Sequence, residues 1–158
     1  MIRCKVSAAK LDAAALLGEP ASPAHGARVV FLGVVRAENV GRRVVAVEYD
    51  AHGPLAERTL EQIAGEAVAK WGPDLDIVVE HRTGRLEVGE ASVAVIVGSR
   101  HRDEGYLASR YVLEELKVRV PIWKKEVYED GETAWLRGHA LCGHADRHRA
   151  AQGEPTTE

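Results

Sequence analysis

Cysteine is scarce in this chain, which has only Cys4 and Cys142 among its 158 residues. So few cysteines exclude a disulfide framework and are typical of a reducing compartment such as the cytoplasm. Long apolar runs are also missing, because the most apolar segment, residues 92–98, is strand-length and too short to span a bilayer. The N-terminal Ala/Leu run is interrupted by Lys10 and Asp12, which excludes the continuous apolar segment of a signal peptide. We therefore predict a cytoplasmic protein without membrane spans.

An excess of positive charge is absent too. The formal net charge is −3 and the sequence pI is about 6.2, which argues against a general nucleic-acid binder, for which a basic domain is expected. With 46% hydrophobic and 28% charged residues, the composition is that of an ordinary globular protein of one domain. Any anion-binding site must therefore be local.

The hydrophobic periodicity predicts a mixture of strands and helices. Strands are expected at residues 2–7, 27–36, 44–49, 77–81, 92–97, 122–128 and 133–136, and helices at residues 11–17, 54–71 and 103–117. We expect 27–36 and 44–49 to pair as a hairpin, 92–97 to be central in its sheet, and Asp103 to cap the last helix. Because no strict βαβ period is present, the predicted class is α+β, a mainly antiparallel sheet with packed helices.

Composition divides the chain into three parts. Residues 1–25 read as a lead-in of one strand and one helix that ends in a Gly/Pro-rich loop, residues 26–138 as the main domain, and residues 139–158 as a flexible polar tail. The tail begins with His139, Cys142, His144 and His148. These are metal-ligand residue types at short spacing, but a second paired element of zinc motifs is lacking, so we do not assign a metal site.

The segment from Leu116 to Glu126 is the most informative part of the chain. It places four cations around an apolar Pro-Ile-Trp step, and solvated charge runs rarely contain tryptophan. Lys117 near the end of a helix and Lys124 in the following strand can converge on one anionic substrate. On a helix, Tyr106, Arg110, Leu113 and Lys117 lie close to one line, and we expect this face to point inward. A partly desolvated Lys117 at its end would have a lowered pKa and could act as a base or a nucleophile. The alternative is a lysine that only complements the helix dipole.

Two further candidate anion-binding elements stand elsewhere. At residues 99–102 a strand gives way to a helix N-terminus, where free N–H groups suit a phosphate and His101 and Arg102 add donors. The alternative is an ordinary polar turn. Arg36 ends the first long strand and is a third candidate cation, although an arginine taken alone most simply lies on the surface.

Several of these motifs occur in a fixed order along the chain. They are FLGVVR from Phe31 to Arg36, His81-Arg82-x-Gly84, Ser99-x-His101-Arg102, and LKVRVPIWKKE from Leu116 to Glu126, followed by Asp130-Gly131 and Trp135. The ordered set resembles the large, catalytic subunit of molybdopterin synthase, the MoaE family. The resemblance runs from about Gly26 to Trp135, whereas the first residues and the tail match poorly.

The resemblance implies an α/β-hammerhead fold and a sulfurtransferase of molybdenum cofactor biosynthesis. Such enzymes convert cyclic pyranopterin monophosphate to molybdopterin by installing two dithiolene sulfurs. The sulfur arrives as a thiocarboxylate on the C-terminal glycine of a small ubiquitin-like subunit, and two large subunits form the central dimer of a heterotetramer. No metal and no cofactor is implied for the large subunit itself.

By position, Lys117 and Lys124 correspond to the family's catalytic lysines. The residues that correspond to its substrate pocket are Val34, Val35, Arg36, His101, Arg102, Lys117, Lys124, Lys125 and Glu126. The sequence departs from the family where Ala37 follows Arg36 in place of the usual Asp or Asn, so the hydrogen bonding of that loop is expected to differ. Either Arg137 or His139 could supply a further basic residue, and that position stays unassigned.

Two other functions remain open on the residues alone. The cationic cluster could belong to a non-catalytic module that binds a phosphorylated ligand or an acidic protein tail, in which case Lys117→Ala would weaken binding without abolishing turnover. The histidines of the tail could instead belong to a metal-binding regulatory protein, which metal analysis of the purified chain would test.

Overall fold

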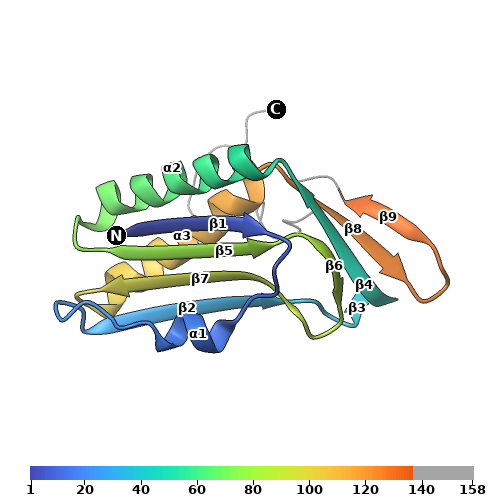
Figure 1. Ribbon diagram of the computed structural model, residues 1–158, viewed down its shortest axis with the longest axis horizontal. Helices are drawn as coiled ribbons and strands as arrows, with labels where there is room; N and C mark the ends of the chain where they lie inside the picture. The colour runs from blue at the N-terminus through green and yellow to red at the C-terminus, as the bar shows by residue number, and fades with distance from the viewer. Residues whose placement is uncertain (137–158) are drawn as a thin grey trace.

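The structure is a computed structural model, and it describes residues 1–136 of the chain. Along the sequence its elements are β1 (Ile2–Ser7), α1 (Ala13–Gly18), β2 (Ala27–Val34), β3 (Glu38–Asn39), β4 (Arg42–Ala51), α2 (Gly53–Trp71), β5 (Asp76–Arg82), β6 (Gly84–Glu87), β7 (Ala91–Ser99), α3 (Arg102–Arg119), β8 (Ile122–Tyr128) and β9 (Thr133–Leu136). They form two sheets, with helices packed on the first (Figure 1). The predicted α+β class is confirmed.

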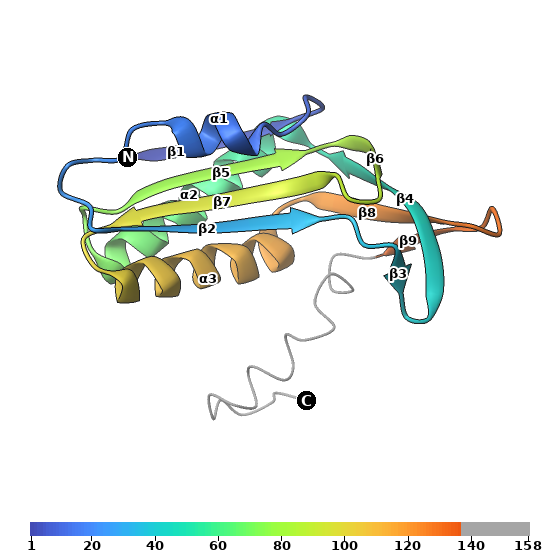
Figure 2. The ribbon, with the colours of Figure 1, turned by 90° about the horizontal axis from the view of Figure 1, so that it is seen from below.

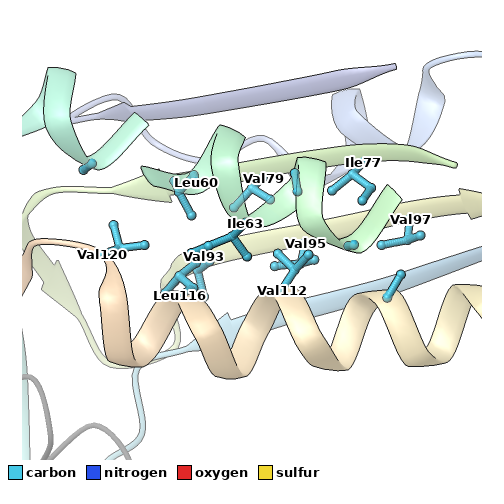
Figure 3. Packing of buried hydrophobic residues seen from close by; sticks show 14 of the residues in the cluster. Leu60, Ile63, Ile77, Val79, Val93, Val95, Val97, Val112, Leu116 and Val120 are labelled. Carbon is cyan, nitrogen blue, oxygen red and sulfur yellow. The ribbon is translucent and has the colours of Figure 1, made fainter. Parts of the chain in front are cut away.

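The first sheet has the strand order β1-β5-β7-β2, and its pairs are antiparallel except for the parallel pair of β1 and β5. Side chains alternate between its two faces. The odd-numbered apolar residues of β5 and β7, from Ile77 to Val97, pack against α2 and α3 (Figure 3). The even-numbered ones, such as Val78 and Ile96, pack against Leu16 of α1 on the opposite face. Helices therefore cover both faces, and β7 is central as predicted.

Two long helices close the main core. α2 begins after His52, whose ring accepts a hydrogen bond from the Leu55 amide, and it ends at Gly72, where φ is +124°. It buries Leu60 and Ile63 completely against the sheet. In the part of the chain that the structure describes, no helix is both long enough and apolar enough to span a membrane.

The second sheet lies beyond one end of the first (Figure 1) and has the order β3-β4-β8-β9, with β6 also pairing with β4. β4 pairs with β6 along one edge and with β8 along the other, through the same residues 46–49, and β8 and β9 pair across a turn at residues 129–131, as predicted. The predicted helix at 54–71 is confirmed. β6, which has only four residues, was not among the predicted strands.

The predicted hairpin of residues 27–36 with 44–49 is wrong. β2 pairs along its whole length with β7, and after Gly33 the pairing becomes irregular. Val35 then exchanges backbone hydrogen bonds with Glu90 and Gly89, which leads the chain out of the first sheet and into the second. The hairpin that does form joins β3 to β4 through Val40 and Gly41, which have φ of +50° and +74°.

Two expectations for α3 are also wrong. The helix begins at Arg102 with His101 as the N-cap and no side-chain cap, so Asp103 lies within the first turn instead of capping it. The line of residues through Tyr106 and Arg110 does not face the core, since Tyr106 is 64% exposed. The buried face is formed instead by Ala108, Val112 and Leu116 and their neighbours.

Candidate active site

Strand β8 carries a polar row on one face. Because side chains alternate along a strand, Lys124, Glu126 and Tyr128 point to the same side. The exposed fraction of Lys124 is 17%, whereas Glu126 is essentially inaccessible at 2%. Lys124 is in register with Tyr49 of β4 on the neighbouring strand. A carboxylate at this depth is costly unless it is paired and hydrogen-bonded.

Glu126 meets that condition through three hydrogen bonds. The Lys124 Nζ donates to Oε1 over 2.6 Å, while the Tyr128 hydroxyl and the Asn39 amide donate to Oε2 over 2.8 and 2.9 Å. Burial by itself raises the pKa of the Glu126 carboxyl, but the hydrogen bonds that it accepts outweigh burial, and its pKa lies below the ordinary value of 4.5. The carboxylate is therefore ionised and holds the ammonium group of Lys124 in place.

A small cavity of about 40 Å³ opens beside this pair. Its lining combines residues from the end of β2, the β3–β4 hairpin, β4 and β8: Val34, Val35, Arg36, Glu38, Asn39, Val47, Tyr49, Lys124 and Glu126. Arg36 is exposed, and its Nη2 donates to the Asn39 Oδ1 over 3.0 Å. The structure thus brings five of the predicted site residues, Val34, Val35, Arg36, Lys124 and Glu126, around one space.

Lys125 points to the other side of β8 from Lys124. It forms an ion pair with Glu48 of β4, and its Nζ lies 5.4 Å from the ring centroid of Trp135. It does not line the cavity. Its predicted contact with substrate therefore stays a prediction.

Lys117 lies in the last turn of α3, which leads directly into β8 (Figure 2). This end of the helix is firmly held, because Arg119 donates to the Glu66 carboxylate of α2 over 2.6 and 2.9 Å, and Tyr111 donates to the same group. Lys117 itself is half-buried and does not line the cavity. The two candidate lysines therefore sit on consecutive elements whose junction is fixed.

His101 and Arg102 lie at the opposite end of α3. With a rise of 1.5 Å per residue, the helix places His101 about 24 Å from Lys117 along its axis. Both residues are exposed, and the N–H groups of the first turn lack a side-chain cap. Their turn is compact because Gly105 packs on Ser99, where a Cβ would lie 2.6 Å from the serine Oγ. Within one chain, these two residues do not join the cavity.

The sequence analysis missed Asn39 and Tyr128, which donate to Glu126, and also Glu38 and Tyr49 of the cavity lining. The signal for Tyr128 was available, since it continues the every-second-residue row of Lys124 and Glu126. For Asn39, nothing local predicts that its side chain reaches a residue 87 positions later. The candidate zinc residues of the tail, and the open choice between Arg137 and His139, lie outside the described residues.

Fold and site together define an α+β protein that presents a lysine amine, held by a buried carboxylate, next to an arginine suited to anions. The family model described as MoaE protein matches residues 6–119. The chain is 48% identical over 118 residues to the molybdopterin synthase catalytic subunit of Synechococcus elongatus, covering 75% of this chain and 72% of that protein. The chain belongs to the MoaE family, which confirms the resemblance seen in its motifs.

Solved structures agree with this assignment. The molybdopterin synthase of Staphylococcus aureus matches with a TM-score of 0.78 and 35% identity, over 84% of this chain and 95% of that one. A complex of subunits 1 and 2 of the molybdopterin-converting factor from Helicobacter pylori matches with a TM-score of 0.68 over 86% and 90%. At 20% identity the latter likeness shows the fold alone.

Proposed function

We propose that this chain is the catalytic subunit of a molybdopterin synthase and transfers sulfur to cyclic pyranopterin monophosphate to form the dithiolene of molybdopterin. Family membership supports the reaction. The observation that carries the proposal is Lys124, held 2.6 Å from the buried Glu126 and facing the cavity that Arg36 also lines. The sparse use of cysteine supports a cytoplasmic location.

The roles of the residues follow from their chemistry. Arg36 offers fixed donors to the cyclic phosphate, and Lys124 offers a point charge to an oxygen of the pterin. Lys117 supplies an amine that either moves a proton or forms a transient covalent link during the transfer. Lys125 lies on the other side of β8, where its ion pair with Glu48 joins β8 to β4.

We propose that His101 and Arg102 complete the pocket from a second copy of the chain. They lie about 24 Å from Lys117 along α3, too far to reach the same substrate within one protomer. In a two-fold dimer whose two α3 helices run antiparallel, the α3 N-terminus of one copy would lie next to the cavity of the other. The large-subunit dimer implied by the family resemblance provides such an axis.

The sulfur donor is proposed to be a small ubiquitin-like subunit whose C-terminal thiocarboxylate enters the cavity. The Helicobacter pylori complex of two subunits shares this fold, and membership of the MoaE family supports such a partner. The positive groups around the cavity suit an anionic thiocarboxylate as well as a phosphate. The resulting assembly is a heterotetramer of two large and two small subunits.

The test is reconstitution of the purified chain with thiocarboxylated small subunit and the cyclic precursor. Molybdopterin should form, and Lys117→Ala should reduce its rate by about 100-fold or more. Lys10→Ala is the matched control, because Lys10 is exposed and pairs only loosely with Glu90, at 3.5 Å. If the wild-type chain binds the precursor but yields no dithiolene product, the chain is a binding module and the proposal is rejected.

A further inference from the structure

The side chain of Asn39 joins two groups that the proposed reaction needs. Its Oδ1 accepts a hydrogen bond from Arg36 over 3.0 Å, and its Nδ2 donates to Glu126 Oε2 over 2.9 Å. Glu126 in turn holds Lys124 over 2.6 Å. One carboxamide therefore links the guanidinium to the carboxylate that positions the amine.

Only a carboxamide of this length has the chemistry for this link. The oxygen of asparagine accepts while its nitrogen donates, whereas an aspartate has no donor to offer to a second carboxylate. The link also matters for ionisation, because the Asn39 hydrogen bond is one of those that keep the pKa of Glu126 below its ordinary value. Without it, the carboxylate keeps its donors from Lys124 and Tyr128 only.

Strand pairing and the contacts of the paired residue, Arg42, hold Asn39 in place. It sits beside the two-residue turn at Val40 and Gly41, paired in register with Arg42 of β4. The Arg42 guanidinium lies 3.6 Å over the ring of Tyr128 and donates to Asp130 over 2.9 Å. The hairpin is thus fastened to the end of β8, which leaves the carboxamide little freedom to move away from Glu126.

Val40 shows that this hairpin geometry is maintained against a local preference. It has φ of +50° and is 93% exposed, and a positive φ is costly for a β-branched residue. No packing of its own side chain compensates for this. The strain persists because contacts on either side of the turn fix the backbone, which is the pattern found around functional sites.

We propose that Asn39 is a positioning residue for sulfur transfer, whose carboxamide sets Arg36 and Lys124 at a fixed separation through Glu126. This inference rests on the proposed function, since it assigns Asn39 a part in the same site. Asn39 touches neither sulfur nor substrate in this role. It acts through the two charged groups on either side of it.

Asn39→Asp tests the link with an isosteric change. The aspartate still accepts from Arg36 but faces Glu126 with a like charge. We expect molybdopterin formation at saturating precursor to slow by about 10- to 100-fold, with the half-saturating precursor concentration close to that of the wild type. The acid limb of the pH–rate profile should move to higher pH, because Glu126 then protonates more readily. Asn39→Ala removes both hydrogen bonds and should also raise the half-saturating concentration several-fold.

Val40→Asn is the control for the hairpin itself, since it keeps the turn and touches neither charged group. It should show wild-type rates, and placing Asn39→Ala in the Val40→Asn background keeps the hairpin formed if the single variant unfolds. The inference is overturned if Asn39→Asp retains the wild-type rate, or if the rate falls while the acid limb stays in place. A wild-type chain that forms no product would instead reject the proposed function.

Discussion

The two sheets of this molecule bury different kinds of side chain. Among the described residues, the first sheet and its helices enclose an apolar core of sixteen buried residues, centred on Leu60, Ile63, Val95 and Val112. In the same part of the chain, the second sheet encloses an apolar cluster of five, and next to it the carboxylate of Glu126 is almost completely buried. The larger apolar core therefore lies in the first region, and the buried carboxylate lies in the second.

This difference teaches how the fold supports an ionic site. A buried carboxylate needs a rigid frame that brings several donors to it, and the strands of the second sheet supply Lys124, Tyr128 and Asn39 from two directions. The apolar core keeps the second sheet in place through α3, which runs directly into β8. Substitutions in the two regions should consequently separate stability from activity.

The largest effect is expected at the ionic site. Lys124→Ala should reduce molybdopterin formation by about 1,000-fold. It should also lower the free energy of unfolding by about 3 kcal/mol, because Glu126 is left buried without its cation. Both are measured on one preparation, by reconstituted synthesis and by urea denaturation.

A double variant separates these two losses. Lys124→Ala with Glu126→Gln removes both charges, so much of the lost unfolding free energy should return while activity stays low. Full recovery of activity in the double variant would show that the pair is only structural, and the contrast between the two sheets would fail.

The apolar core should behave in the opposite way. Leu60 is completely buried between α2 and the first sheet, so Leu60→Ala should lower the free energy of unfolding by about 3 to 4 kcal/mol through a cavity. Activity per folded molecule should stay close to that of the wild type at 25 °C. A large loss of activity in fully folded protein would mean that the core also tunes the site.

Much of the first sheet was predictable from sequence because its signal is local. The apolar residues of β7 and the helical periodicity of α2 specify the elements directly. The partner of β2 was not predictable in this way, since β4 and β7 are both rich in β-branched residues. The actual choice depends on the irregularity after Gly33, which turns the chain toward the second sheet.

The site was predictable only in part, for a similar reason. Lys124 and Glu126 lie two residues apart on one strand, so their proximity follows from the sequence. Asn39 meets Glu126 only after the hairpin and the long strand β4 are in place, and no sequence spacing encodes that contact. The His101-Arg102 turn was recognised as a candidate, but its distance from the cavity follows from the length of α3.

The junction of the two sheets should be sensitive to acid through His81. This ring is 5% exposed on β5 and lies edge-on to Tyr49 of the second sheet, with 5.0 Å between ring centroids. Burial lowers its pKa from 6.5 to about 4. The unfolded chain therefore takes up a proton below pH 6.5 that the folded chain takes up only near pH 4. The contribution of His81 to the free energy of unfolding is therefore fully present above pH 6.5. It decreases as the pH falls, and about 3 kcal/mol of it is lost at pH 4.

His81→Phe keeps an aromatic ring against Tyr49 and removes the titration. The difference in the free energy of unfolding between the variant and the wild type should increase in favour of the variant from pH 7 to pH 4. Because both proteins have the same carboxylates, the contribution of these groups to the pH dependence cancels in the difference. A difference that stays constant over this range would show that His81 is not buried in its neutral form.

The smallest effect concerns the turn of the β3–β4 hairpin, where local preference and fold disagree at Val40. Val40→Asn should raise the free energy of unfolding by about 1 kcal/mol, because asparagine tolerates the positive φ that Val40 adopts and Asn-Gly is the favoured pair for such a turn. Val88 is a matched control, because it is also exposed and also precedes a glycine of positive φ. It differs from Val40 in that its own φ is not among the positive values of the described residues. Val88→Asn should give no gain. If both substitutions change the free energy of unfolding equally in urea denaturation, Val40 is not strained. The hairpin would then not be held against a local preference by the contacts on either side of it.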